Sequence, residues 1–126
     1  RSAQFRLPQN RYCIENRAAD MTMNVYLALS MTMSAAVEGI EKKMNPGKPT
    51  DQDLYNMSDN EFKKLGIRRL PRNLLMAIEA LKSDKLTDEV LGPIMKKSLL
   101  AYKNDEWERY HQAVTDWEVK EYLRLY

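Results

Sequence analysis

The sequence predicts an α+β fold that is mostly α, with a strand pair within residues 1–17 and about five helices within residues 22–126. Three observations support this prediction. Side chains of different character alternate in AQFRLP and RYCIENR, which is typical of strands. From Asn24 onward apolar residues recur at near-helical spacing. The segments SDNE and TDWE have the form of capping boxes, which mark helix starts.

The strand pair is predicted from alternation on both sides of a turn. In AQFRLP, Phe5 and Leu7 face one side of the strand and Arg6 faces the other. The following PQN is a turn signal, and in RYCIENR the same alternation places Glu15 and Arg17 on one face. Two strands alone are marginally stable in water. We therefore expect this hairpin to belong to a larger sheet that is absent from these 126 residues.

The first helix is expected within residues 24–44, which contain no Pro and one Gly. Asn24 is its candidate N-cap. Its many small residues predict close approach to a sheet or to another helix. The segment NPGKPT, residues 45–50, is expected to end the helix because its prolines bracket a glycine.

Two shorter helices are expected next. Ser58 with Glu61 forms the first capping box, and Gly66 is expected to end that helix. Pro71 is expected to open the following helix. The apolar stripe of that helix comprises Leu74, Leu75, Ile78 and Leu81.

The C-terminal part predicts two more helices. Gly92-Pro93 separates the preceding region from a long amphipathic helix over residues 94–114. Thr115 with Glu118 forms the second capping box and is expected to start the terminal helix.

Composition limits the function classes. A hydrophobic content of 44% and a charged content of 30% fit a soluble globular domain able to bury a core. The net charge of +2 gives no electrostatic reason to expect nucleic acid or an anionic membrane as partner. A single cysteine rules out an intrachain disulfide framework, and we expect a cytoplasmic protein. The chain begins without Met on a strand-like segment, which suggests a piece of a longer protein.

Autonomous catalytic motifs are absent from the sequence: there is no Walker A loop, GxGxxG, GxSxG, CxxC or HExxH. Cys13 is interpreted as a buried structural thiol rather than a nucleophile. His111, the only histidine, is interpreted as a surface or packing residue rather than a catalytic one.

The charged strand face is the candidate site. Arg1, Arg6, Glu15 and Arg17 come from adjacent strands and are expected to converge. Guanidinium groups offer forked donors to phosphate oxygens, and a carboxylate is a hard ligand for Mg²⁺ or Mn²⁺. The set therefore suits a triphosphate with its metal. The alternative, which spacing alone favours, is a solvated face with a salt bridge.

Several segments in fixed order bear on this choice. RSAQFRLP is followed by IENR, ADMTMNVYLA and GIEKKMNPGKP, and the chain ends near WEVKEY. In this order the segments resemble the C-terminal part of glutamine synthetase catalytic domains of type I. The family pattern runs approximately as R-S-A-x-x-R-I-P, R-I-E-x-R-x-x-D, N-P-Y-L-A and P-G-x-P. The resemblance implies that residues 1–126 are the C-terminal portion of such a domain, with active-site strands at 1–17 and a helical region at 22–126.

The resemblance implies an ATP-dependent glutamate–ammonia or glutamate–amine ligase of nitrogen metabolism. In that family ATP phosphorylates the γ-carboxylate of glutamate, and ammonia or a small amine then displaces phosphate. Arg1 matches the arginine that stabilises the transferring phosphoryl group, and Arg6 matches an arginine on the ATP phosphates. Glu15 matches a ligand of the metal, Mg²⁺ or Mn²⁺. Arg17 matches the arginine that contacts phosphoryl and substrate carboxylate groups.

The resemblance also implies a homo-oligomeric full-length enzyme whose other metal ligands lie upstream, so the isolated chain is expected to be inactive. Tyr55 falls where some bacterial glutamine synthetases carry an adenylylated tyrosine. A plain exposed loop tyrosine is the favoured interpretation, because the residues around it depart from the family pattern.

Two departures keep alternatives open. Tyr12-Cys13 replace the arginines of the family's R-R-I-E, and Arg11 is a candidate substitute two residues away. The ending DWEVKEYLRLY resembles enzymes that act on methylamine or other amines, so the acceptor stays open. The alternative function is a non-catalytic helical interaction or assembly module. The missing arginine at position 13 favours that alternative, whereas retention of the four charged residues favours the ligase.

Overall fold

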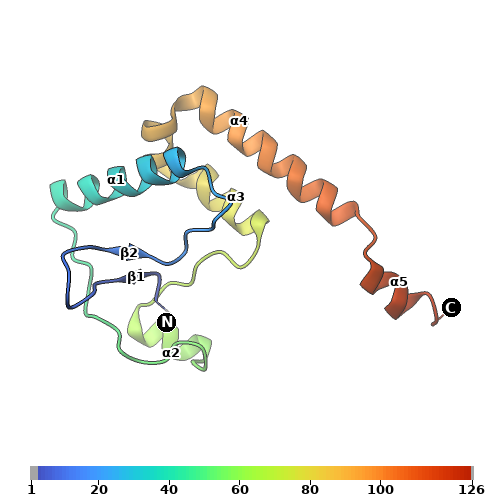
Figure 1. Ribbon diagram of the computed structural model, residues 1–126, viewed down its shortest axis with the longest axis horizontal. Coiled ribbons are helices and arrows are strands. Elements are labelled where there is room, and N and C mark those ends of the chain that lie inside the picture. Colours follow the sequence, from blue (N-terminus) through green and yellow to red (C-terminus); the bar gives the residue numbers. More distant parts are fainter. Residues whose placement is uncertain (1–2, 126) are drawn as a thin grey trace. The chain divides into compact units, whose positions relative to one another are not determined.

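The computed structural model describes residues 3–125. The strands are β1 (Phe5–Arg6) and β2 (Glu15–Asn16). The helices are α1 (Val25–Glu41), α2 (Asp59–Leu65), α3 (Leu74–Ser83), α4 (Lys85–Gln112) and α5 (Asp116–Tyr122) (Figure 1). The predicted α+β fold, mostly helical with an N-terminal strand pair, is confirmed. The chain divides after Leu70 into two compact units.

The strand pair is antiparallel. Phe5 lies opposite Asn16, and Arg6 lies opposite Glu15. The backbone N–H of Arg17 donates to the carbonyl of Gln4 at 2.8 Å, which extends the pairing by one residue. The strands are two residues each, shorter than the segments whose alternation predicts them. A longer strand pair would need stabilisation from further strands or from a packed face, and in the described residues β1 and β2 pair only with each other.

Helix α1 begins where the sequence predicts. The Asn24 side chain accepts hydrogen bonds from the backbone N–H groups of Tyr26 and Leu27, at 3.1 and 3.2 Å. The helix ends at Glu41, before the proline-containing segment, and Lys43 adopts a positive φ of 49°. None of the helix residues is buried. The close packing that its small residues predict is therefore not formed within residues 3–125.

Helix α2 has both halves of its predicted capping box. The Ser58 hydroxyl accepts from the Glu61 N–H at 3.4 Å, and the Glu61 carboxylate accepts from the Ser58 N–H at 2.7 Å. Gly66 ends the helix with a φ of 66°, which favours glycine. Phe62 is buried beneath the Arg69 guanidinium, whose central carbon lies 4.1 Å from the ring centroid.

Helix α3 begins three residues later than predicted. Pro71 does not open it, because the Asn73 side chain accepts the N–H of Met76 at 2.9 Å and so fixes the start at Leu74. Of the predicted apolar stripe, Ile78 is the buried residue. Helices α3 and α4 pack against each other.

The predicted break at Gly92-Pro93 is a kink within α4. Gly92 has φ 67° and ψ 169°, which no helix contains. Lys96, on the far side of the kink, is 6% exposed. Its ammonium donates to the carboxylate of Asp88 at 2.7 Å and to the carbonyl of Asp84 at 3.1 Å. Because both acceptors precede the kink, this side chain ties the two parts of α4 together.

The apolar core is small. Within residues 3–125 the buried apolar side chains are Phe62 and Ile78. Large apolar side chains such as Tyr12 and Ile94 are exposed. The expectation of a buried thiol is wrong: Cys13 is exposed, because the bend before β2 is not covered by other elements. In the described part of the chain, no helix combines the length and the apolarity needed to cross a membrane.

The contacts of Lys96 with Asp84 and Asp88, which form a clamp across the α4 kink, predict a stability effect. Replacing Lys96 with Met keeps an apolar chain of similar length but removes two hydrogen bonds from a nearly buried ammonium. We expect a loss of about 1–3 kcal/mol in unfolding free energy, measured by urea unfolding followed by circular dichroism. The control Lys97→Met changes an exposed neighbour. Equal losses for the two variants would contradict the clamp.

Candidate functional site

One face of the strand pair carries the charged residues. The register places Arg6 directly across from Glu15, and Arg17 follows β2 in a turn. Nη1 of Arg6 lies 3.2 Å from Oε2 of Glu15 and 3.4 Å from Oε1. The structure therefore brings together the two residues from different strands that the sequence predicts as neighbours.

A second guanidinium holds the same carboxylate. Arg11 lies in the bend before β2, and its Nη2 is 2.5 Å from Oε1 of Glu15. Strand alternation places residues 11 and 15 on one face but does not bring them into contact, since four residues of strand span about 13 Å. The contact arises because the chain bends at this point. Sequence reasoning offered Arg11 only as a candidate substitute and did not predict this pair.

Arg17 is less constrained than the two paired arginines. Arg17 is fixed through its backbone, and its exposed side chain makes no ion pair with any residue from 3 to 125. Arg1 lies outside the described residues, so its predicted role is untested.

The cluster is electrostatically an anion site. Hydrogen bonding from Arg6, assisted by Arg11, lowers the pKa of Glu15 below its usual range against a smaller opposing effect of desolvation. Two guanidiniums against one carboxylate leave the cluster with a net positive charge. The side chains of Arg6 and Arg11 are 50% and 63% exposed, so they retain donors directed to solvent. Such donors suit phosphate oxygens.

A complete metal site is not present in the described residues. Between residues 3 and 125, no group of three or more His, Cys, Asp or Glu side chains is placed to hold a metal ion. Mg²⁺ takes about six oxygen ligands. Glu15 supplies one carboxylate, and any metal on this face needs its other ligands from elsewhere.

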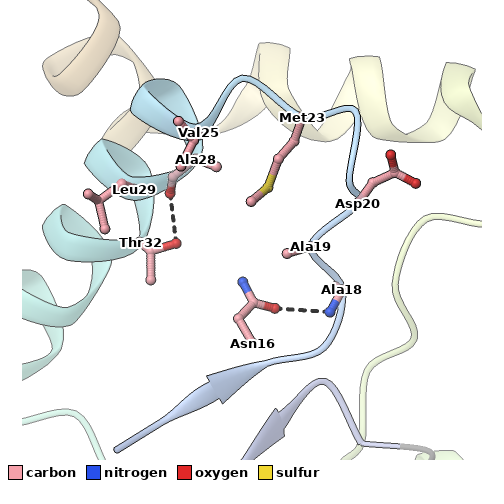
Figure 2. Close-up of a pocket in the computed structure, with 9 residues that line it drawn as sticks. All are labelled: Asn16, Ala18, Ala19, Asp20, Met23, Val25, Ala28, Leu29 and Thr32. Atoms are coloured by element: carbon pink, nitrogen blue, oxygen red, sulfur yellow. Dashed lines mark hydrogen bonds between the residues drawn. The ribbon is translucent and has the colours of Figure 1, made fainter.

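The opposite side of β2 borders an open hollow of about 470 Å³ (Figure 2). Asn16 lines it and points away from the face of Glu15. Its amide oxygen accepts the N–H of Ala18 at 3.1 Å. Asp20, also in the lining, accepts hydrogen bonds from the backbone and hydroxyl of Thr22, which lower its pKa. The rest of the lining is mostly apolar, and comprises Ala18, Ala19, Met23, Val25, Ala28, Leu29 and Thr32. The hollow therefore offers a packing surface rather than reactive groups.

Two other predicted residues lie on the surface. Tyr55 is 76% exposed in a turn, where the Asp53 carboxylate accepts its N–H at 3.0 Å. This position is accessible, and adenylylation of Tyr55 stays a prediction. His111 is exposed and stacks on Trp107 with ring centroids 5.0 Å apart, in keeping with the predicted surface or packing role.

Comparison with known proteins gives three concordant findings. The family described as "Glutamine synthetase, catalytic domain" matches residues 1–122. The chain is 39% identical to a glutamine synthetase of Methanocaldococcus jannaschii, over 98% of this chain and 28% of that protein. It is 36% identical to a glutamate–methylamine ligase of Methyloversatilis universalis, over 100% of this chain and 28% of that protein.

A solved structure is also similar. Apo GmaS without ligand is 30% identical and matches with a TM-score of 0.72, over 87% of this chain and 25% of that chain. The present chain thus spans less than a third of the length of these relatives. It belongs to the glutamine synthetase catalytic-domain family, as the resemblance in its sequence indicates.

The ion pairs of Glu15 predict its titration. Because its folded-state pKa is lowered, the pairs stabilise the strand pair above the ordinary glutamate pKa of about 4.3. That contribution is lost as the pH falls through the lower folded-state pKa. We expect Arg6→Gln and Arg11→Gln each to raise the Glu15 pKa, with the larger rise for Arg6→Gln. Carboxyl ¹³C NMR measures this.

Arg68→Gln, which changes an exposed arginine distant in sequence, is the control for that titration. A Glu15 pKa that stays unchanged in both cluster variants would show that the two ion pairs are not formed in solution.

Proposed function

We propose that the protein carrying this chain is an ATP-dependent glutamate–ammonia or glutamate–amine ligase. This chain supplies the C-terminal portion of its catalytic domain. The observation that carries the proposal is the cluster of Arg6, Arg11 and Glu15 at the strand pair and its connecting bend, in a chain that matches the glutamine synthetase catalytic domain over residues 1–122. The names of the relatives, glutamine synthetase and glutamate–methylamine ligase, support both choices of nitrogen donor.

The charged face is assigned to the phosphoryl-transfer half of the reaction. ATP phosphorylates the γ-carboxylate of glutamate, and ammonia or an amine then displaces phosphate from the acyl phosphate. Arg6 binds ATP phosphates, Arg17 contacts the phosphoryl group and the substrate carboxylate, and Arg1 stabilises the group in transfer. These roles need positioned positive charge rather than covalent chemistry, because phosphoryl transfer depends mainly on alignment and neutralisation of phosphate oxygens.

Glu15 is assigned as one ligand of Mg²⁺ or Mn²⁺, which neutralises phosphate charge when bound. The described residues do not complete that coordination. The remaining ligands are assigned to the part of the protein that this chain does not include. Exposed apolar side chains supply a surface for that part and for homo-oligomeric assembly.

A second candidate is a non-catalytic helical interaction or assembly module. The observation that favours it is Cys13, an exposed and uncharged residue where the resemblance predicts an arginine. In that case the charged face is a solvated surface, and the helices serve assembly.

Activity of the full-length protein distinguishes the two candidates. With glutamate, ATP and Mg²⁺, we expect ADP release that depends on ammonia or methylamine. Glu15→Gln should lower this turnover by about 10²-fold or more, because it removes a charged ligand from the metal. The control Glu41→Gln changes an exposed glutamate at the end of α1. Absence of turnover with every amine, in a folded protein, would favour the assembly module.

The isolated 126-residue chain should show no glutamate-dependent ADP release in the same coupled assay. The reason is that its described residues supply one acidic ligand on the charged face, whereas a divalent metal needs several. Measurable glutamate-dependent turnover by the isolated chain would overturn the assignment of the other ligands to the missing part.

A further inference from the structure

The two arginines that hold Glu15 are anchored differently. Arg6 belongs to β1, and its backbone is paired directly across from Glu15. Arg11 lies in the bend between the strands, where the backbone contact nearby joins the Cys13 N–H to the Arg11 carbonyl at 3.1 Å. The strand pairing therefore fixes the position of Arg6 relative to Glu15 but does not fix that of the Arg11 side chain.

Arg11 also keeps unused donor capacity. Its contact with Glu15 uses Nη2 and one carboxylate oxygen, whereas a guanidinium has five N–H donors. With 63% of the side chain exposed, the guanidinium is accessible to solvent. Arg11 is thus able to meet an incoming anion without leaving the charged face.

Glu15 cannot coordinate a cation with both carboxylate oxygens while the two guanidiniums bind it. Its two oxygens accept from Arg6 and Arg11, and the surrounding positive charge opposes approach of a free divalent ion. An arriving polyphosphate changes this balance, because it brings several negative charges to the same face. One of the two guanidiniums can then donate to a phosphate oxygen, which is a stronger acceptor than the Glu15 carboxylate that both guanidiniums share.

We propose that Arg11 is an exchange residue: it pairs with Glu15 in the unliganded protein and with a phosphate oxygen when a polyphosphate binds, which removes the shorter of the two contacts on Oε1 of Glu15. This inference rests on the proposed function, and it adds a phosphate-binding residue and a binding order to it. Polyphosphate releases the carboxylate from Arg11, so a divalent metal joins Glu15 together with the polyphosphate rather than before it.

The test uses the full-length protein, with inorganic tripolyphosphate and ATP as probes in isothermal titration calorimetry. We expect Arg11→Gln to weaken binding of both probes by about tenfold or more, the scale of one charge-assisted hydrogen bond. Arg11→Lys keeps the charge but loses the fork, so its loss should be smaller. Arg6→Gln serves as the positive comparison. Arg68→Gln is the matched exposed control and should leave binding unchanged.

A second readout separates exchange from a merely structural role. Adding metal-free tripolyphosphate should shift the Arg11 guanidinium ¹⁵N signal and the Glu15 carboxyl ¹³C signal together in the unmodified protein. The Glu15 shift should be much smaller in Arg11→Gln. Thermal unfolding of each variant confirms that it is folded, and Arg11→Lys retains the test if Arg11→Gln is unstable.

The outcomes distinguish failure of the Arg11 exchange from failure of the proposed ligase function. If Arg6→Gln weakens binding while Arg11→Gln and Arg11→Lys bind as tightly as the unmodified protein, the exchange is overturned and the ligase proposal stands. If the unmodified protein binds neither probe, both are overturned. Saturable binding of Mg²⁺ at Glu15 without polyphosphate would overturn the binding order.

Discussion

The pairing of Arg6 with Glu15 across the two strands is the constraint on which the rest of the candidate site depends. A shift of register by one residue would turn every side chain of one strand to the other face. Glu15 would then lie away from Arg6, and Asn16 would replace it on the charged face. The observed register instead separates the charged face on one side of β2 from the apolar hollow on the other. The charged side chains and the apolar packing surface therefore lie on opposite faces of the same short strand pair.

The charge balance of this face decides which ligand it favours first. The carboxylate of Glu15 stays ionised and its charge is compensated by the guanidiniums around it, whose hydrogen bonds lower its pKa. An anion therefore gains more from the face than a free cation does. Metal binding becomes favourable once phosphate has added negative charge, since the metal then has oxygen ligands from both Glu15 and the phosphate. In the proposed ligase the same residues bind phosphate and metal, because the first ligand changes the electrostatic field that the second one meets.

Sequence reasoning succeeded where a structural feature depends on a few neighbouring residues. The caps at Asn24, Ser58 and Thr115 are hydrogen bonds that span two or three residues, and all three are formed as predicted. It failed where the outcome depends on distant parts of the chain. Burial of Cys13 needs a covering element, and no pattern in residues 11–17 reports whether one exists. The contact between Arg11 and Glu15 depends on how the chain bends before β2, which side-chain periodicity does not encode.

The charged face does not distinguish ammonia from methylamine. In the proposed reaction the arginines and the glutamate act on phosphate, substrate carboxylate and metal, which are common to both amines. The two acceptors differ by one methyl group, and a hydrophobic pocket discriminates such a difference by about 1–3 kcal/mol. A few apolar contacts supply that much, so an identity of 39% to a glutamine synthetase and 36% to a methylamine ligase does not decide the acceptor. In the proposed ligase the choice of amine therefore depends on the shape of the acceptor pocket, whereas the arginine–glutamate cluster is assigned to phosphoryl transfer with either amine.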